Sequence, residues 1–228
     1  MNSARFLVGA AIGLTITGHA AFAQDLSHYR GFALEASLES VITASGARVA
    51  DTKTLHERPA RIQELEWRTP YASWGRERTD PVRGIAFTFY NDALYQVMVT
   101  YDRDRTDGLT NADIIESISA TYGVPVTGSA GNGVRRAAPL PQDTIALAQW
   151  ENAASSLTLL RGTYTPEFQL MLVSKPLSLR AQNAIRESVR LDAVEAPRRE
   201  IERRKQEVAD ANAARDKTRT TNKEAFHP

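Results

Sequence analysis

The sequence predicts an α+β fold: two repeats of a short helix followed by an antiparallel meander of about three strands, plus a C-terminal helical tail. Three observations lead to this prediction. Two short amphipathic segments each end at a glycine, and runs with strand periodicity follow both of them. The first segment has a glutamate and a glycine, Glu39 and Gly46, and the second has the same two residue types with the same spacing, Glu116 and Gly123. Residues 178–228 are rich in charged, helix-forming side chains.

The recurring order of elements divides the chain after its first 23 residues. Residues 24–107 form the first helix-plus-meander repeat, 108–177 the second, and 178–228 the tail. A duplicated unit explains this order. The alternative is a chance likeness, since any two amphipathic helices that end in glycine share these features.

The first predicted helix has Leu34, Leu38, Val41 and Ile42 on one face and ends at Gly46. Residues at these spacings lie on the same side of an α-helix. A glycine directly after such a stripe is typical of a helix C-terminus, where the chain adopts a left-handed conformation.

The second predicted helix carries Ile114, Ile115 and Ile118 on one face and ends at Gly123. Thr110 and Asp113 have the spacing of a capping box, with aspartate in the place usually taken by glutamate. We therefore expect this helix to begin directly after Thr110.

Strands are predicted where apolar and polar residues alternate. In the first, the charged Glu64 and Glu66 alternate with apolar side chains, so one face is expected to meet solvent. In the third, Tyr95 is expected to share a face with Val97. The predicted strands are 62–67, 84–90, 94–101, 145–150, 156–160 and 168–173.

Residues 1–23 have the features of a cleavable secretory signal peptide. Arg5 supplies a positive charge, an apolar run follows from Phe6 to Thr17, and Ala21-Phe22-Ala23 fits a signal peptidase site. We expect cleavage after Ala23, a mature chain that begins at Gln24, and a location in the periplasm or outside the cell. An uncleaved N-terminal anchor is the alternative.

Composition excludes several classes of protein. The chain has 28 basic and 27 acidic residues, so loss of Arg5 with the leader leaves equal numbers, which argues against a nucleic-acid binder. Without cysteine the chain has neither disulfides nor a lipidation site. No later apolar run has the length of a membrane span, so the mature protein is expected to be soluble.

No motif for a metal, a nucleotide or a catalytic nucleophile stands out, so we predict no cofactor. His28 and His56 are far apart and have no ligand spacing. Asp102–Gly108 places its glycine one residue too late for a calcium loop. Gly128–Gly133 lacks the Lys-Ser/Thr ending of a phosphate loop.

The best binding candidate is the loop that links the first two predicted strands. It combines Tyr71 and Trp74 with Arg76 and Arg78, residue types enriched in interface hot spots. The alternative is that Tyr71 and Trp74 fold back and cover the end of the sheet.

In the tail, Ser178 is predicted to cap a helix that runs to about Val194. Pro197 is predicted to interrupt the helical pattern after it. Residues 198–217 again favour helix, whereas 218–228 have no pattern and are expected to be disordered.

An apolar row and a basic cluster mark the second part of the tail. Val194, Ile201 and Val208 lie seven residues apart, which is too little for a coiled coil. The cluster could contact an anionic surface such as lipid headgroups or another envelope protein. Alternatively, it belongs to a solvated helix held by pairs such as Glu200–Arg203 and Glu200–Arg204. Its members are Arg198, Arg199, Arg203, Arg204 and Lys205, interspersed with Glu200 and Glu202.

The segment Tyr29–Leu34, the helix that ends at Gly46 and the meander after it resemble the small α-β module of the outer-membrane assembly lipoprotein BamE. The tandem arrangement over residues 29–176 is similar to β-lactamase inhibitory protein. The resemblance lies in the order of elements, and the chain lacks the lipid-bearing cysteine of the first family and the disulfides of the second. It implies a periplasmic binding or assembly module, not an enzyme.

The sequence thus leads to two functional hypotheses. The first is an exported soluble protein that binds an envelope protein through a sheet face or the Trp74 loop. The second is a periplasmic hydrolase with an unrecognised site, for which His56 facing a partner in a deep pocket would be evidence.

Overall fold

The computed structural model describes residues 25–68, 80–126 and 138–225. Its main element is a seven-stranded antiparallel sheet in the order β3-β4-β5-β6-β9-β8-β7, beside a two-stranded hairpin formed by β1 and β2. The predicted α+β class is confirmed. The predicted leader, residues 1–23, lies outside the described residues.

The six predicted strands and the two predicted helices that end at Gly46 and Gly123 are present, but Leu34, expected on the first helix, lies before its start at Leu38. The strands are β1 (His28–Tyr29), β2 (Phe32–Ala33), β3 (Thr52–His56), β4 (Ile62–Arg68), β5 (Val82–Tyr90), β6 (Ala93–Tyr101), β7 (Thr144–Glu151), β8 (Ser155–Gly162) and β9 (Phe168–Ser174). The helices are α1 (Leu38–Ser45), the short 3-10 turn η1 (Val49–Asp51), α2 (Arg103–Thr106), α3 (Asn111–Tyr122) and α4 (Lys175–Ala225).

Helices α1 and α3 begin and end at the residues that local chemistry favours. The Ser37 hydroxyl accepts a hydrogen bond from the Ser40 N–H, and Gly46 ends α1 with a left-handed φ of 67°. The predicted capping box of α3 is present, because Thr110 and Asp113 each accept from the other's backbone N–H.

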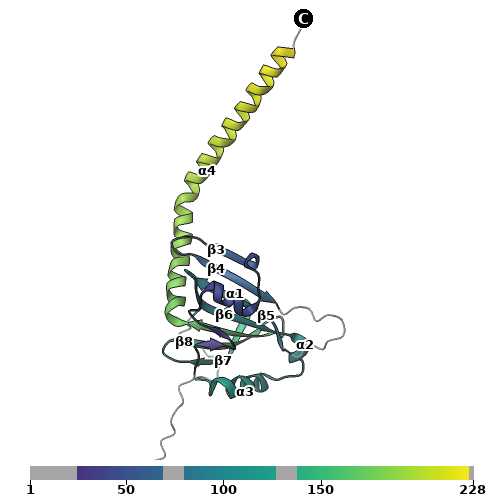
Figure 1. Cartoon of the computed structure of the whole chain (residues 1–228), viewed down its shortest axis with the longest axis vertical. Coiled ribbons are helices and arrows are strands. Elements are labelled where there is room, and N and C mark those ends of the chain that lie inside the picture. Colours follow the sequence, from purple (N-terminus) through teal and green to yellow (C-terminus); the bar gives the residue numbers. More distant parts are fainter. Residues whose placement is uncertain (1–24, 69–79, 127–137, 226–228) are drawn as a thin grey trace, which may run out of the picture.

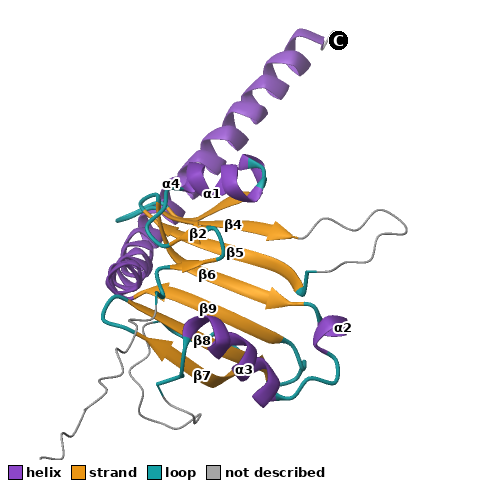
Figure 2. Ribbon diagram, turned by 60° about the horizontal axis from the view of Figure 1, so that its bottom comes forward, coloured by secondary structure: helices purple, strands orange, loops and turns teal. Residues whose placement is uncertain are grey.

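One face of the sheet holds the main hydrophobic core. A continuous row of apolar side chains crosses six strands on this face, and all its members are buried: Leu65, Phe87, Val97, Leu172, Leu157 and Trp150. Helices α1 and α3 cover this face through Val41 and Ile118 (Figure 2). The row passes through the β6–β9 pair, so both meanders share one core.

The opposite face is partly covered by the start of α4. Ala181 packs against Ile62 and Tyr95, while Ala138 packs against a separate cluster that includes Met171. The helix runs along one end of the strands and continues beyond β3 (Figure 1). The face of β4 that the sequence predicts to meet solvent is therefore covered at this end of the sheet, where Ile62 is 1% exposed.

The predicted face of Tyr95 is also wrong. Thr88 pairs with Gln96 and Phe89 pairs with Leu94, so Tyr95 is the extra residue of a β-bulge. The bulge sends Leu94 into the main core and Tyr95 to the opposite face, where α4 covers it.

The first half of the sheet has one strand more than predicted. β3 forms the edge beside β4, through pairs such as Thr54 with Gln63. Its sequence, Thr52–His56, contains a single large apolar residue, Leu55, which is 44% exposed. An edge strand of this kind has no buried stripe, so its sequence carries little periodicity.

Helix α4 differs from the prediction at its start, its middle and its end. It begins at Lys175 directly after β9, so Ser178 lies inside the helix and is 1% exposed instead of capping it. Pro197 lies within the helix and does not end it. Proline removes one hydrogen bond and bends the axis, and α4 changes direction above the sheet (Figure 1).

The last turns of α4 are helical, although the sequence suggested disorder there. The helix continues to Ala225. Thr218 and Thr220 are accommodated because their hydroxyls donate to the carbonyls of Ala214 and Asp216, at 3.0 and 2.9 Å. Among the described residues, no helix has both the length and the apolar content needed to cross a membrane.

Candidate functional site

The four residues predicted to bind a partner, Tyr71, Trp74, Arg76 and Arg78, lie outside the described residues. The structure places the ends of their loop at Arg68 of β4 and at Asp80 before β5. The binding role of this loop stays a prediction.

His56 does face a partner, but in a setting that does not suit catalysis. Its Nδ1 atom lies 3.0 Å from the Ser188 hydroxyl, at the point where α4 passes the end of β3. Ser188 is only 6% exposed, so the helix and the sheet cover the hydroxyl that would have to attack a substrate. The pair joins the edge strand to α4.

Glu64 and Glu66, considered above as solvent-facing carboxylates, border a hollow of about 630 Å³ at the β3 edge. Trp67 borders it as well, although its side chain projects to the other face of β4. The hollow therefore has lining residues from both faces of β4, with the two glutamates on one face and Trp67 on the other. It lies open at the edge of the sheet and does not enclose the two carboxylates. Glu66 is exposed and is 3.3 Å from the Arg68 guanidinium.

A tyrosine-rich cluster joins the N-terminal hairpin to the sheet. Arg30 donates two hydrogen bonds to Asp80, at 2.7 and 2.9 Å, and its guanidinium lies 5.4 Å from the centre of the Tyr29 ring. Burial raises the pKa values of Tyr29 and Tyr101, which share a hydrogen bond. These groups satisfy one another, so the cluster anchors the hairpin.

The longest uninterrupted run of exposed residues in the described fold is the second part of α4. We call residues 196–225 the arm. From Ile201 to Ala225 every residue is exposed, and the last ion pair between α4 and the sheet domain joins Arg58 to Glu195. At about 1.5 Å per residue, the arm extends roughly 45 Å away from the sheet (Figure 1).

An apolar row runs along α4 into the arm. Val194, Ile201 and Val208, which we call the stripe, are 60%, 55% and 60% exposed. Ile201 and Val208 line a shallow groove together with Lys205 and Asn212. Residues seven apart lie close to one line on a helix, so the stripe is a continuous though narrow apolar surface.

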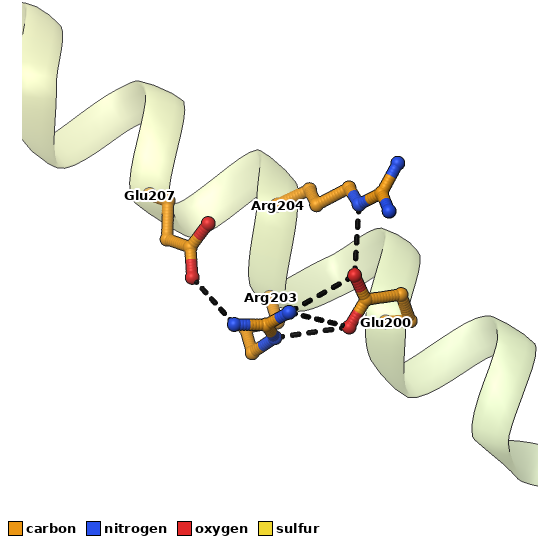
Figure 3. A network of polar contacts seen from close by, with 4 residues as sticks. All are labelled: Glu200, Arg203, Arg204 and Glu207. Atoms are coloured by element: carbon orange, nitrogen blue, oxygen red, sulfur yellow. Dashed lines mark hydrogen bonds and ion pairs between the residues drawn. The ribbon is translucent and has the colours of Figure 1, made fainter.

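A network of ion pairs extends from Arg204, at the rim of the groove beside the stripe, to Arg203 on the opposite side of the arm. Glu200 accepts hydrogen bonds from both Arg203 and Arg204, and Arg203 also pairs with Glu207 (Figure 3). The predicted pairs Glu200–Arg203 and Glu200–Arg204 are confirmed. Exposed pairs of this spacing contribute about 0.3–0.5 kcal/mol each to helix stability. They favour the helix without any contact to the sheet domain.

The face that carries the stripe is basic. At 100° per residue, Arg198 and Lys205 lie beside the stripe, and Arg215 and Arg219 continue the same face of the helix beyond Val208. Asp216 is the acidic residue on this face of the arm. Within the described part of the chain, Arg198, Arg215 and Arg219 pair with no carboxylate, and Lys205 pairs with Glu202 at 2.9 Å.

The described residues contain no cluster of histidine and acidic side chains that could hold a metal ion. Comparison of the chain with known protein families, curated proteins and solved structures found no match.

Proposed function

We propose that this protein is an exported interaction module of the bacterial envelope, in which the sheet domain is the scaffold and α4 carries the contact with another protein. The observation that carries the proposal is the arm, a long helix whose described residues are all exposed from Ile201 onward and which forms no ion pair with the described sheet domain beyond Glu195. The signal-peptide features of residues 1–23 support export and a periplasmic location.

The energetics of the arm favour a binding role. Ordering a residue costs about 1–2 kcal/mol of backbone entropy, and most helices in proteins recover this by burying an apolar face. The arm buries none within the described structure, so its helix depends on local ion pairs such as Glu200–Arg203. A partner that covers the stripe would supply the missing burial.

A duplicated ancestry fits the same proposal. A helix and three antiparallel strands occur as α3 with β7-β8-β9 and as α1 with β4-β5-β6, although in the first half the edge strand β3 stands between the helix and β4. The third strand of each set lies at the centre of the sheet, where β6 pairs with β9. We propose that the two halves derive from one unit, in the manner of the BamE-like and β-lactamase inhibitory protein modules.

The hydrolase hypothesis gains no comparable support. His56 pairs with a buried hydroxyl, and the carboxylates of Glu64 and Glu66 face an open edge. General acid–base chemistry needs a group that a substrate can reach.

Site-specific photo-crosslinking in intact cells tests the proposed function. A photoreactive residue at position 201 should give a crosslink to one discrete envelope protein, whereas the same residue at exposed Tyr164 of the sheet domain should not. The same cells should yield mature protein that begins at Gln24. Absence of any crosslink along the arm, or an intact Met1 in the envelope fraction, would contradict the proposal.

A further inference from the structure

We infer that the segment which binds the arm is an acidic amphipathic helix of a partner protein, with an apolar row on the stripe and carboxylates opposite Arg198, Lys205 and Arg219. This inference rests on the proposed function, because it names the chemistry of the partner that the arm would contact. Two observations lead to this inference: the small width of the stripe and the basic residues on the same face. Together they also argue against a second copy of this chain and against a membrane surface.

The width of the stripe calls for a partner that supplies most of the apolar surface. A two-stranded coiled coil uses two apolar residues per heptad, and the arm has one, at Ile201 and then Val208. Between them the chain places Arg204 and Lys205, which leave a groove with an apolar floor and basic walls. An amphipathic helix with larger apolar residues fits such a groove.

The charges beside the stripe and its small width argue against a second copy of this chain. In an antiparallel pair, arms packed stripe to stripe would bring Arg198 and Lys205 of one copy toward the same basic residues of the other. In a parallel pair, Glu200 would face Lys205, but two stripes with one apolar residue per heptad would lack the second apolar layer of a coiled coil. Like charges across a helix pair are destabilising, whereas opposite charges at flanking positions select the partner. Arg198, Arg215 and Arg219 have no carboxylate of their own within the described chain, so they are available to acidic side chains.

A membrane surface fits the stripe less well than a helix does. Helices that lie on membranes bury a broad apolar face, usually with leucine, phenylalanine or tryptophan. The stripe offers only Val194, Ile201 and Val208, with charged residues in between.

Binding of designed peptides to the full chain from Gln24 tests this inference. The probe is a labelled helical peptide of four heptads, with leucine in its apolar row and glutamate beside it. Its matched control carries lysine in place of every glutamate, and vesicles of phosphatidylglycerol test the lipid alternative. Fluorescence anisotropy should show binding of the acidic peptide that weakens as salt rises, because screening shortens the range of exposed charges.

Charge-reversal variants locate the contact. The double variant R198E/R219E should weaken binding of the acidic peptide at least tenfold, because each change replaces an attraction by a repulsion. The control variant K217E reverses a charge on the side away from the stripe and should change binding less than twofold. Circular dichroism should show equal helix content for all variants, so that any loss of binding is not a loss of helix.

Several results would overturn the inference. These are equal binding of the acidic and lysine peptides, equal effects of K217E and R198E/R219E, tighter binding to the vesicles, or a dimer of the full chain at micromolar concentration. If crosslinking at position 201 captures a protein through a segment that is not acidic, the proposed function stands and this inference fails. If no crosslink forms anywhere on the arm, the proposed function fails first.

Discussion

Removal of residues 197–228 is expected to leave the stability of the sheet domain nearly unchanged. Every described residue beyond Glu200 is exposed, and the ion pairs of this segment, such as Arg203–Glu207, lie within the helix itself. The truncation therefore removes no buried contact with the sheet. It also removes Pro197, whose missing hydrogen bond weakens the helix around it.

The size of the effect follows from these contacts. Changes that touch only exposed residues alter the free energy of unfolding by about 0.5 kcal/mol or less. For a domain of this size, that corresponds to a shift of roughly 1–2 °C in the melting temperature. Removal of all of α4 is different, since it uncovers Ile62 and Tyr95, which are 1% and 7% exposed.

Differential scanning calorimetry of three chains provides the measurement: 24–228, 24–196 and 24–174. The first two should melt within about 2 °C of each other. The third should melt roughly 5–15 °C lower, because uncovering Ile62 alone loses roughly 1.5–3 kcal/mol and the Ser188–His56 hydrogen bond is lost as well. A fall of more than about 5 °C for 24–196 would show that the arm docks on the sheet domain, and the reasoning above would be refuted.

Three further changes test the packing of the scaffold. Burial, aided by the charge of Glu64, raises the pKa of Tyr95 to about 12, so the folded state favours the neutral phenol. The free energy of unfolding should therefore fall above pH 10.0, where the tyrosine of the unfolded chain loses its proton. Urea titrations at roughly pH 9 and pH 11 should show a smaller fall for Tyr95→Phe than for the parent protein. An unaltered pH dependence would contradict this. Ser188→Ala should lower the free energy of unfolding by about 1 kcal/mol, and no change would mean that its bond to His56 does not form. Trp150→Phe should lower it by about 1–3 kcal/mol, because Nε1 of the buried ring donates to the Gly123 carbonyl at 2.7 Å, and a stability equal to the parent would speak against that bond.

The candidate site was only partly predictable. Sequence spacing was sufficient for the Glu200–Arg203 and Glu200–Arg204 pairs and for the stripe, because residues on one helix have fixed relative positions. The sequence could not show that the arm leaves the sheet domain, since exposure depends on what the fold brings near it. It also could not show that Ser188, an ordinary helix residue by pattern, becomes buried against His56.

The errors in the predicted fold have the same origin. Tyr95 follows the alternation of its strand, yet the mismatch between β5 and β6 adds a bulge and reverses its direction. Ser178 has the properties of a helix cap, but β9 passes directly into α4 and the side chain is buried inside the helix instead. The direction of Tyr95 depends on the pairing of β6 with β5, and the burial of Ser178 depends on how α4 packs against the sheet.

The sequence by itself determined the two capped helices, six of the seven strands of the main sheet and the charge pattern of the arm. Each of these is a property of one element, fixed by the periodicity of its own side chains and by the residues at its ends. Only the tertiary structure decided that β6 pairs with β9, that α4 covers Ile62 and Tyr95, and that the arm stands clear of the scaffold. These features depend on which apolar surfaces pack together in the folded protein. The residues of a single segment do not show which distant segment will cover it.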